Sequence, residues 1–269
     1  MPELPEMETY RSLLLYRVTG KTITGCDVTR PKSINLSPES FYAAVVGRQI
    51  VHIDRRAKQL LFVLEDGHVL LLHLMLGGVL FWGTPEQKPD RTVQVALSFG
   101  LETLHFIGLR LGYLHYWTKD ELTRELMGLG PEPLEPSFTE KAFADIASQK
   151  RGSLKASLVD QHFISGIGNC YSDEICFAAG LLPARKIERL DDSEAGRLYR
   201  AIQSILREAT GYGGYMDMPL YIGDNLTGGF DAKCRVYDRE GLPCVRCGNP
   251  IVRKDVGSRK SFCCLNCQH

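Results

Sequence analysis

The chain has 269 residues, of which 44% are hydrophobic and 24% charged, a balance typical of folded proteins and not of disordered ones. Its 32 basic and 32 acidic residues cancel, so net charge alone gives no indication of a nucleic-acid partner. The longest apolar run, Val69 to Leu76, is too short to span a bilayer, and acids stand where a secretory signal needs basic residues, so export is not expected.

The first ten residues, MPELPEMETY, predict the start of a helix. Proline suits a first helical position, and the side chains of Glu3 and Glu6 interact favourably with the positive end of the helix dipole. An amphipathic run to about Leu15 continues the helix. Taken alone, helix chemistry is the simplest explanation for these two glutamates.

Short segments rich in β-branched and apolar residues follow this helix. Turn signals such as Glu65-Asp66-Gly67 separate them, and their close, regular spacing predicts an antiparallel sandwich or barrel. The predicted strands are residues 21–24, 49–53, 60–64, 69–76, 92–99 and 103–107.

The character of the sequence changes near Thr118, which is typical of a helix N-cap. A proline-rich stretch at 128–136 predicts a stiff linker. Helical periodicity then covers about 138–149, 152–161, 169–179 and 191–210, and a glycine-rich stretch follows at 211–229. The predicted domains are therefore a β domain (1–117), a linker (118–136), a helical domain (137–228) and a small C-terminal module (229–269).

The cysteines predict a metal site in the C-terminal module. An odd total of nine, without an export signal, argues against a disulfide framework. Cys244 with Cys247, and Cys264 with Cys267, form two C-x2-C pairs that can bind one tetrahedral Zn²⁺. Cys263 would give a C-x3-C spacing and is placed outside the site. Four thiolates leave no open position, so we expect the zinc to be structural.

Two further features favour an anionic ligand. The segment from Gly229 to His269 is basic, with eight Lys/Arg against four acids. The stretch Gly166-Ile167-Gly168-Asn169 lies between two helical patterns, where glycines permit close approach and a helix N-terminus offers free N–H groups. An ordinary turn explains this stretch equally well by itself, but beside Lys150, Arg151 and Lys155 it indicates a phosphate clamp.

Together these motifs resemble those of the formamidopyrimidine-DNA glycosylase / endonuclease VIII family of bacterial base-excision repair enzymes, over essentially the full length. The resemblance implies a multi-domain α+β fold, with an N-terminal helix and β-sandwich, a helix–two-turn–helix domain and a zinc-binding β-hairpin. The matching motifs are Pro2-Glu3-Leu4-Pro5-Glu6, Arg55-Arg56-Ala57-Lys58, Gly130-Pro131-Glu132-Pro133-Leu134, Gly166-Ile167-Gly168-Asn169 with Asp173-Glu174, and the cysteine array.

The resemblance implies a DNA glycosylase that also acts as a lyase at abasic sites. Once Met1 is removed, Pro2 would present a secondary amine that attacks the sugar carbon of the damaged nucleotide. Glu3 would act as general acid/base and Glu6 would help to order the N-terminus. Lys58 would be a second proton donor, and Arg259 would bind phosphate and assist the second elimination.

The expected partner is double-stranded DNA with damaged bases or abasic sites, bound by a monomer in the bacterial cytoplasm at the nucleoid. Asn169 and Lys155 match the family's contacts with the DNA backbone. Arg91, Arg151 and Gly168 complete the expected DNA-binding set.

The sequence departs from the family in the residues that fill the gap left by a flipped nucleotide. A methionine, an arginine and a phenylalanine of relatives that excise oxidised purines align with Leu76, Leu109 and Leu111. Leucines can wedge between bases but cannot hydrogen-bond the orphaned partner base. Arg110 stands one position from the aligned arginine, and residues 212–230 lack the family pattern of the lesion-capping loop.

Three alternatives therefore stay open. The protein could be specialised for abasic or unusual lesions, or it could be a DNA-structure sensor that keeps the fold with weak catalysis or none. It could also be a tautomerase that uses Pro2 as a base, although the zinc module and basic tail argue against this.

Overall fold

The computed structural model describes residues 1–269, which form two compact units. Unit 1 contains Met1–Met127 and Tyr212–Gly229, and unit 2 contains Gly128–Gly211 and Phe230–His269. These units divide the chain differently from the four predicted domains. Residues 212–228, predicted in the helical domain, belong to unit 1, and the predicted linker 118–136 is divided between the two units. None of the helices is long and apolar enough to cross a membrane.

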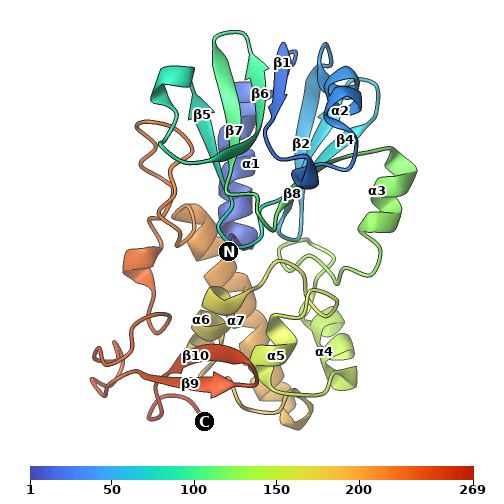
Figure 1. The fold of residues 1–269 in the computed structure, drawn as a ribbon. Coiled ribbons are helices and arrows are strands. Elements are labelled where there is room, and N and C mark those ends of the chain that lie inside the picture. Colours follow the sequence, from blue (N-terminus) through green and yellow to red (C-terminus); the bar gives the residue numbers. More distant parts are fainter. The chain divides into compact units, whose positions relative to one another are not determined.

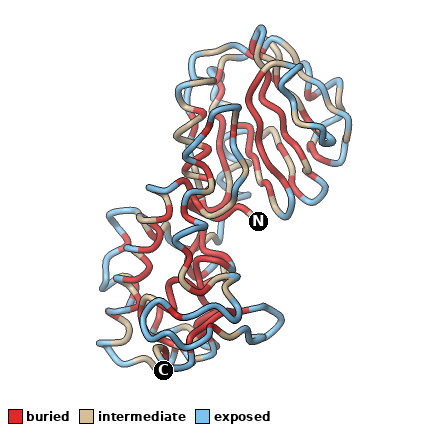
Figure 2. The backbone as a smooth tube through the Cα atoms, turned by 90° about the vertical axis from the view of Figure 1, so that its left-hand side faces the viewer, coloured by how far each residue is buried: buried red, intermediate tan, exposed pale blue.

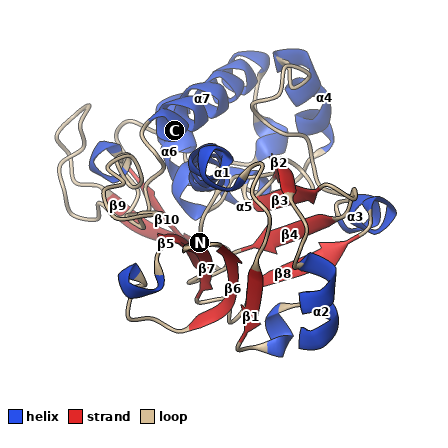
Figure 3. Ribbon diagram, turned by 90° about the horizontal axis from the view of Figure 1, so that it is seen from above, coloured by secondary structure: helices blue, strands red, loops and turns tan.

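Unit 1 is built on two four-stranded antiparallel sheets whose apolar inner faces pack together, as predicted for a sandwich (Figure 3). The edge-to-face pair of Phe62 and Phe106, with ring centroids 6.3 Å apart, joins the two sheets across the core. In Figure 2 the long red stretches in the half of the tube that contains the N-terminus show that much of the sandwich is buried. One sheet has the order β1 (Gly25–Val28), β6 (Val93–Phe99), β7 (Glu102–Ile107), β5 (Val79–Gly83), and the other β2 (Ile50–Arg56), β3 (Gln59–Leu64), β4 (Val69–His73), β8 (Tyr113–Trp117).

Five of the six predicted strands are present, with shifted ends, as β2, β3, β4, β6 and β7. The prediction at 21–24 is wrong, since Thr22 forms only an isolated bridge and β1 begins at Gly25. The sequence analysis missed β5 and β8. Every residue of β5 is buried, so the strand lacks the alternation of apolar and polar residues that marks a half-exposed strand.

Three helices accompany the sandwich of unit 1: α1 (Leu4–Val18), α2 (Pro38–Val45) and α3 (Lys119–Glu125). Helix α1 begins where the sequence predicts it, with Glu3 and Glu6 forming a capping box. It packs against β2 and β3, whereas α3 packs against β4 and β8. Helix α3 begins at the predicted N-cap, Thr118, and α2 was not predicted.

The segment Tyr212–Gly229 belongs to unit 1 because its contacts are made there. The backbone N–H of Tyr215 donates to Glu6 Oε1 at 2.8 Å, and the Tyr10 hydroxyl donates to the carbonyl of Met218 at 2.9 Å. Leu220 is fully buried in the sandwich core. These contacts connect residues more than 200 positions apart, which local sequence patterns do not reveal.

Unit 2 combines four helices with a two-stranded hairpin (Figure 1). All four predicted helices are present, although α5 is shorter than predicted. Helix α6 is central, because it contacts α5, α7 and β10 and is buried along most of its length. The elements of unit 2 are α4 (Glu140–Gln149), α5 (Leu154–Leu158), α6 (Asn169–Ala179), α7 (Asp192–Gly211), β9 (Val252–Val256) and β10 (Arg259–Cys263), with short 3-10 turns at Ile187–Arg189 and Asp231–Lys233. Two further 3-10 turns, Pro31–Ser33 and Pro85–Gln87, belong to unit 1.

The contact between Glu6 and residues 212–229 predicts a strict requirement for glycine at position 214. A Cβ atom on Gly214 would lie 2.2 Å from Glu6 Oε1, and its φ of +75° is unfavourable for other residues. Gly214→Ala should lower the free energy of unfolding by roughly 2–4 kcal/mol, from overpacking and backbone strain together.

Gly223→Ala is the matched control, because Gly223 has a φ of +94° but nothing within 4 Å of the added Cβ. It should cost only the backbone strain, about 1–2 kcal/mol. Denaturant unfolding of both variants measures the difference, and equal losses would show that the Glu6 contact does not constrain this segment.

Candidate functional site

The N-terminal turn of α1 places the first predicted site residues in a buried setting. Pro2 is buried, and Glu3 and Glu6 are each only 2% exposed. Glu6 Oε2 accepts the backbone N–H of Glu3 at 2.8 Å, while Glu6 Oε1 accepts that of Tyr215. Glu6 therefore holds the start of the chain in place, which leaves Pro2 and Glu3 fixed beside each other at the end of a rigid helix.

Lys58 lies in the two-residue turn between β2 and β3, where Arg56 and Gln59 are paired. Its side chain is only 5% exposed, which is unusual for lysine. Burial and, to a smaller extent, the positive charge of Lys58 lower the pKa of the nearby His73 to about 4. The imidazole is therefore neutral near pH 7. His73 lies within the apolar run from Val69 to Leu76, at the end of β4.

Three loops of unit 1 line a hollow of about 510 Å³ that contains Leu76, Arg91, Arg110 and Leu111. Leu76 and Leu111 are 62% and 61% exposed, so both are free to contact a ligand. Arg91 and Arg110 are also exposed, and the guanidinium of Arg91 donates to the carbonyl of Gly77 at 3.3 Å. The hollow thus combines two apolar tips with two cations.

Leu109 differs from its neighbours in its burial, which does not favour the predicted insertion into DNA. Its side chain is fully buried in the sandwich core. Its backbone is held on both sides, since its N–H donates to Gln94 Oε1 at 2.8 Å and its carbonyl accepts the Ser33 hydroxyl at 2.9 Å. Alignment gives the position of Leu109 in the loop but not the direction of its side chain, which the core determines.

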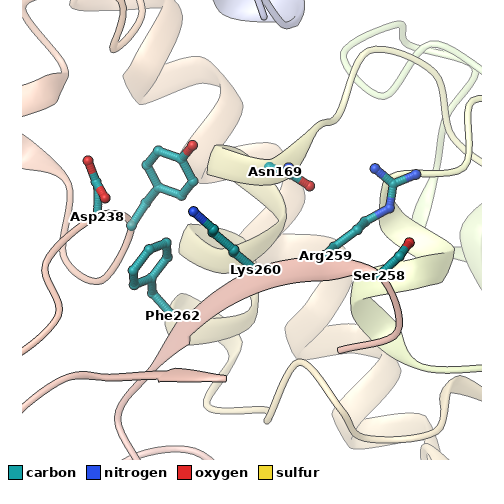
Figure 4. A pocket seen from close by; sticks show the side chains of 7 residues that line it. Asn169, Asp238, Ser258, Arg259, Lys260 and Phe262 are labelled. Atoms are coloured by element: carbon teal, nitrogen blue, oxygen red, sulfur yellow. The ribbon is translucent and has the colours of Figure 1, made fainter. Parts of the chain in front are cut away.

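A pocket of about 440 Å³ opens in unit 2 between the start of α6 and the hairpin. Figure 4 shows Asn169 projecting from α6, and Arg259 and Lys260 from β10. An amide, two cations and a helix N-terminus form a setting suited to a phosphate group. Asp238 is the single acid among its lining residues, which are Asn169, Tyr237, Asp238, Ser258, Arg259, Lys260 and Phe262.

Lys155 is fully buried, a setting that does not favour the predicted direct contact with DNA. Lys155 and Asp173 form an ion pair of 2.9 Å in which both side chains are fully buried. Lys155 also donates to the backbone carbonyl of Asn169 at 2.7 Å, so it fixes the residue that lines the pocket. A charge pattern in the sequence cannot distinguish a buried lysine from an exposed one.

Two adjacent carboxylates on α6 hold the walls of this pocket. Asp173 Oδ2 accepts the backbone N–H of Phe262 at 3.1 Å, and its Oδ1 accepts the Ser261 hydroxyl at 2.5 Å. Glu174 Oε1 accepts the three consecutive N–H groups of residues 235–237 at 2.8–3.0 Å. Burial raises the pKa of Asp173 to about 6, although Lys155 and these hydrogen bonds act in the opposite direction.

The other predicted basic residues of unit 2 lie outside the pocket. Lys150 pairs with Asp160 at 2.5 Å, and Arg151 is exposed and donates to the carbonyls of Ser148 and Lys150. Gly168 is the N-cap residue of α6, directly before Asn169. Gly168 therefore borders the start of α6, and neither Gly168 nor Arg151 lines the pocket.

The four cysteines predicted to bind metal come together. The sulfur atoms of Cys244, Cys247, Cys264 and Cys267 all lie within 4.8 Å of one another, with pairs at 3.5 and 3.9 Å. Tetrahedral zinc with Zn–S bonds of about 2.3 Å requires sulfur atoms roughly 3.8 Å apart, so the site fits one Zn²⁺. Cys263 is not part of this group, as predicted. The zinc is structural, and three of its cysteines, Cys244, Cys264 and Cys267, belong to an apolar cluster with Phe177 and Phe262.

Comparison with known proteins agrees with this arrangement. Three family models match consecutive parts of the chain: the formamidopyrimidine-DNA glycosylase N-terminal domain (residues 1–113), the H2TH domain of the same proteins (129–217) and a zinc finger found in FPG and IleRS (241–269). The formamidopyrimidine-DNA glycosylase of Pelotomaculum thermopropionicum is 38% identical over 275 residues, covering 100% of this chain and 99% of the relative.

Solved structures extend the similarity. The MutM (Fpg) protein of Thermus thermophilus superposes with a TM-score of 0.88 at 38% identity, covering 99% of this chain and 98% of that one. The Lactococcus lactis Fpg in complex with DNA containing an abasic site gives a TM-score of 0.92 at 28% identity, covering 99% of both chains. The chain therefore belongs to the formamidopyrimidine-DNA glycosylase family.

Proposed function

We propose that this protein removes damaged bases from double-stranded DNA and cleaves the strand at the resulting abasic site, with the Pro2 nitrogen as nucleophile. The observation that carries the proposal is the buried N-terminal turn, in which Pro2 and Glu3 are held by Glu6. Membership of the family supports DNA as substrate, and the Lactococcus lactis relative has been solved with abasic-site DNA and with Fapy-dG DNA.

The proposed chemistry begins with the free amine of Pro2 after removal of Met1. An α-amino group titrates near pH 8, roughly two units below lysine, so a useful fraction is neutral at physiological pH. The nitrogen lone pair forms a bond to C1′ of the sugar as the C1′–base bond breaks. The nitrogen then loses its hydrogen as a proton, and the base leaves with a proton. Opening of the sugar ring gives an iminium ion between Pro2 and C1′, and the ring oxygen takes up a proton.

Strand cleavage follows from this iminium ion. The positive nitrogen acidifies the C2′ hydrogen, and loss of this proton expels the 3′ phosphate by elimination. Glu3 is the proposed general acid/base in ring opening and in these proton transfers, and Lys58 is the proposed proton donor near the base or sugar. Arg259 is proposed to bind a phosphate and to assist the second elimination.

The pocket of unit 2 is the proposed binding site for a DNA phosphate. Asn169, Arg259 and Lys260 supply the hydrogen-bond donors and the positive charge. Asp173, Glu174 and Lys155 bind the backbone of residues that line the pocket, and they are not proposed to contact DNA themselves. Contacts of this kind set the position of the duplex and carry no sequence information.

Leu76 and Leu111 are the proposed wedge that fills the gap left by the flipped nucleotide. Their exposure suits this role, whereas buried Leu109 contributes only to the loop's shape. Neither wedge residue can hydrogen-bond the orphaned base, so excision should depend weakly on the opposite base unless Arg91 or Arg110 reads it. Substrates that are already unstacked, such as abasic sites, should be favoured because flipping them costs less.

The role of Pro2 predicts a covalent complex that depends on a free N-terminal proline. Borohydride and abasic-site DNA should trap the processed wild type, while protein that retains Met1, or Pro2→Gly, should be trapped almost not at all. Gel analysis of the complex, with DNA binding measured separately, provides the test. Equal trapping of all three proteins would refute Pro2 as nucleophile, and absence of trapping in the wild type would favour a DNA-structure sensor.

The phosphate pocket predicts a specific electrostatic signature for Arg259. Arg259→Ala should weaken DNA binding for every sequence. Because one phosphate contact is lost, the slope of the logarithm of the binding constant against the logarithm of the salt concentration should become shallower by about 1. Arg253→Ala is the matched control, since Arg253 is exposed on the adjacent strand β9 but does not line the pocket. Titrations at several salt concentrations distinguish the variants, and the same change of slope in both would contradict a defined site.

The raised pKa of Asp173 predicts how binding responds to acid. As pH falls through about 6, protonation of Asp173 removes the charge that holds Lys155 and Ser261. DNA affinity should then fall roughly tenfold, the effect of about one charged hydrogen bond, although the protein becomes more cationic.

Loss of folding does not explain such a decrease. Because the folded pKa lies above the ordinary value of 3.8, protonation of this group increases the free energy of unfolding as pH falls from about 6 to about 4. Asp173→Asn should bind weakly at both pH 7.5 and pH 5 and show no further decrease. Affinity of the wild type that is constant or rises at pH 5 would contradict this role of Asp173.

A further inference from the structure

The turn that carries Lys58 has an unusual backbone. It contains only Ala57 and Lys58, and Ala57 has a φ of +53°. Two-residue hairpin turns with positive φ at the first residue normally contain glycine there, because other residues are strained in this region. Ala57 is also 3% exposed. Alanine keeps this conformation only where its surroundings impose it.

The side chain of Arg55 contacts this strained residue directly. Arg55 Nη1 donates to the carbonyl oxygen of Ala57 at 2.9 Å, and Arg55 Nε donates to Glu8 Oε2 at 3.1 Å. The Arg55 side chain is only 8% exposed. A planar guanidinium that is bonded on two sides in a buried setting has a single orientation, so it fixes the carbonyl that immediately precedes Lys58.

Glu8 connects this turn to the helix that begins at the proposed nucleophile. It lies on α1, two residues after Glu6, and its other carboxylate oxygen, Oε1, accepts Arg11 Nε at 2.9 Å. The carboxylate therefore accepts one hydrogen bond from Arg11 on its own helix and, through its other oxygen, one from Arg55 on β2. Through Glu8, Arg55 and the Ala57 carbonyl, the position of Lys58 is tied to that of α1.

We infer that Glu8 and Arg55 are positioning residues that act through Lys58. The inference rests on the proposed function, in which Lys58 donates a proton close to the sugar of the damaged nucleotide. Proton transfer requires heavy atoms about 2.6–3.2 Å apart, and a displacement of about 1 Å can cost roughly 100-fold in rate. Arg55 holds the turn in the conformation that places the Lys58 amine within this distance of the atom that receives the proton.

The test measures single-turnover release of the base from a duplex containing one Fapy-dG, across a range of pH. Arg55→Leu should reduce the rate roughly 10- to 100-fold and shift its pH profile, whereas borohydride trapping on abasic-site DNA, which uses Pro2, should stay within about twofold. Lys58→Gln should reduce the rate at least as much. In the Lys58→Gln background, Arg55→Leu should have no further effect, because the two residues act as one unit.

Arg11→Leu is the matched control. It removes the other cation that contacts Glu8 but leaves Arg55 bonded to the Ala57 carbonyl, so base release should stay near that of the wild type. Ala57→Gly should partly restore base release in Arg55→Leu, because glycine adopts the required φ without strain. This rescue distinguishes positioning from a general loss of folding, which thermal unfolding also monitors.

Two results would overturn the inference. One is that Arg55→Leu reduces the rate of base release by the same factor in the wild type and in the Lys58→Gln background. The other is that Arg11→Leu reduces this rate as much as Arg55→Leu does. Failure of the proposed function gives a different result: wild-type protein would not release the base, or Lys58→Gln would release it at the wild-type rate.

Discussion

In each unit of this protein, a buried carboxylate that accepts backbone N–H groups stabilises the folded conformation. Glu6 accepts the backbone N–H groups of Glu3 and Tyr215. Glu174 accepts the three consecutive backbone N–H groups of residues 235–237. Such hydrogen bonds are strong because the acceptor is charged and water is excluded. Removing an acceptor would leave several buried donors without partners, so these positions tolerate little change.

The same principle explains why the proposed site residues are at the starts of helices. Pro2 and Glu3 directly precede α1, and Asn169 is the first residue of α6. A helix is a rigid support, and each of these helices also carries the carboxylate that ties it to distant parts of its unit. Chemistry that depends on sub-ångström placement is thereby supported by elements that move little.

How far the sequence predicts this protein depends on whether the decisive interaction is local. The spacing of Cys244, Cys247, Cys264 and Cys267 sufficed for the zinc site, because each pair needs only a tight turn. Strand and helix periodicity likewise predicted most of both units. Burial was not predictable in the same way: Leu109 and Lys155 occupy positions that suggest DNA contact, yet tertiary packing places both inside. The contacts of residues 212–229 with α1 also lie beyond any local pattern.

The most direct test of this account is a crystal structure of the protein trapped by borohydride on abasic-site DNA. The account predicts a covalent bond from the Pro2 nitrogen to C1′ of the opened sugar, and a DNA phosphate within hydrogen-bonding distance of Asn169 and Arg259. A bond from the Lys58 amine instead, or a pocket at Asn169 without a phosphate, would contradict it.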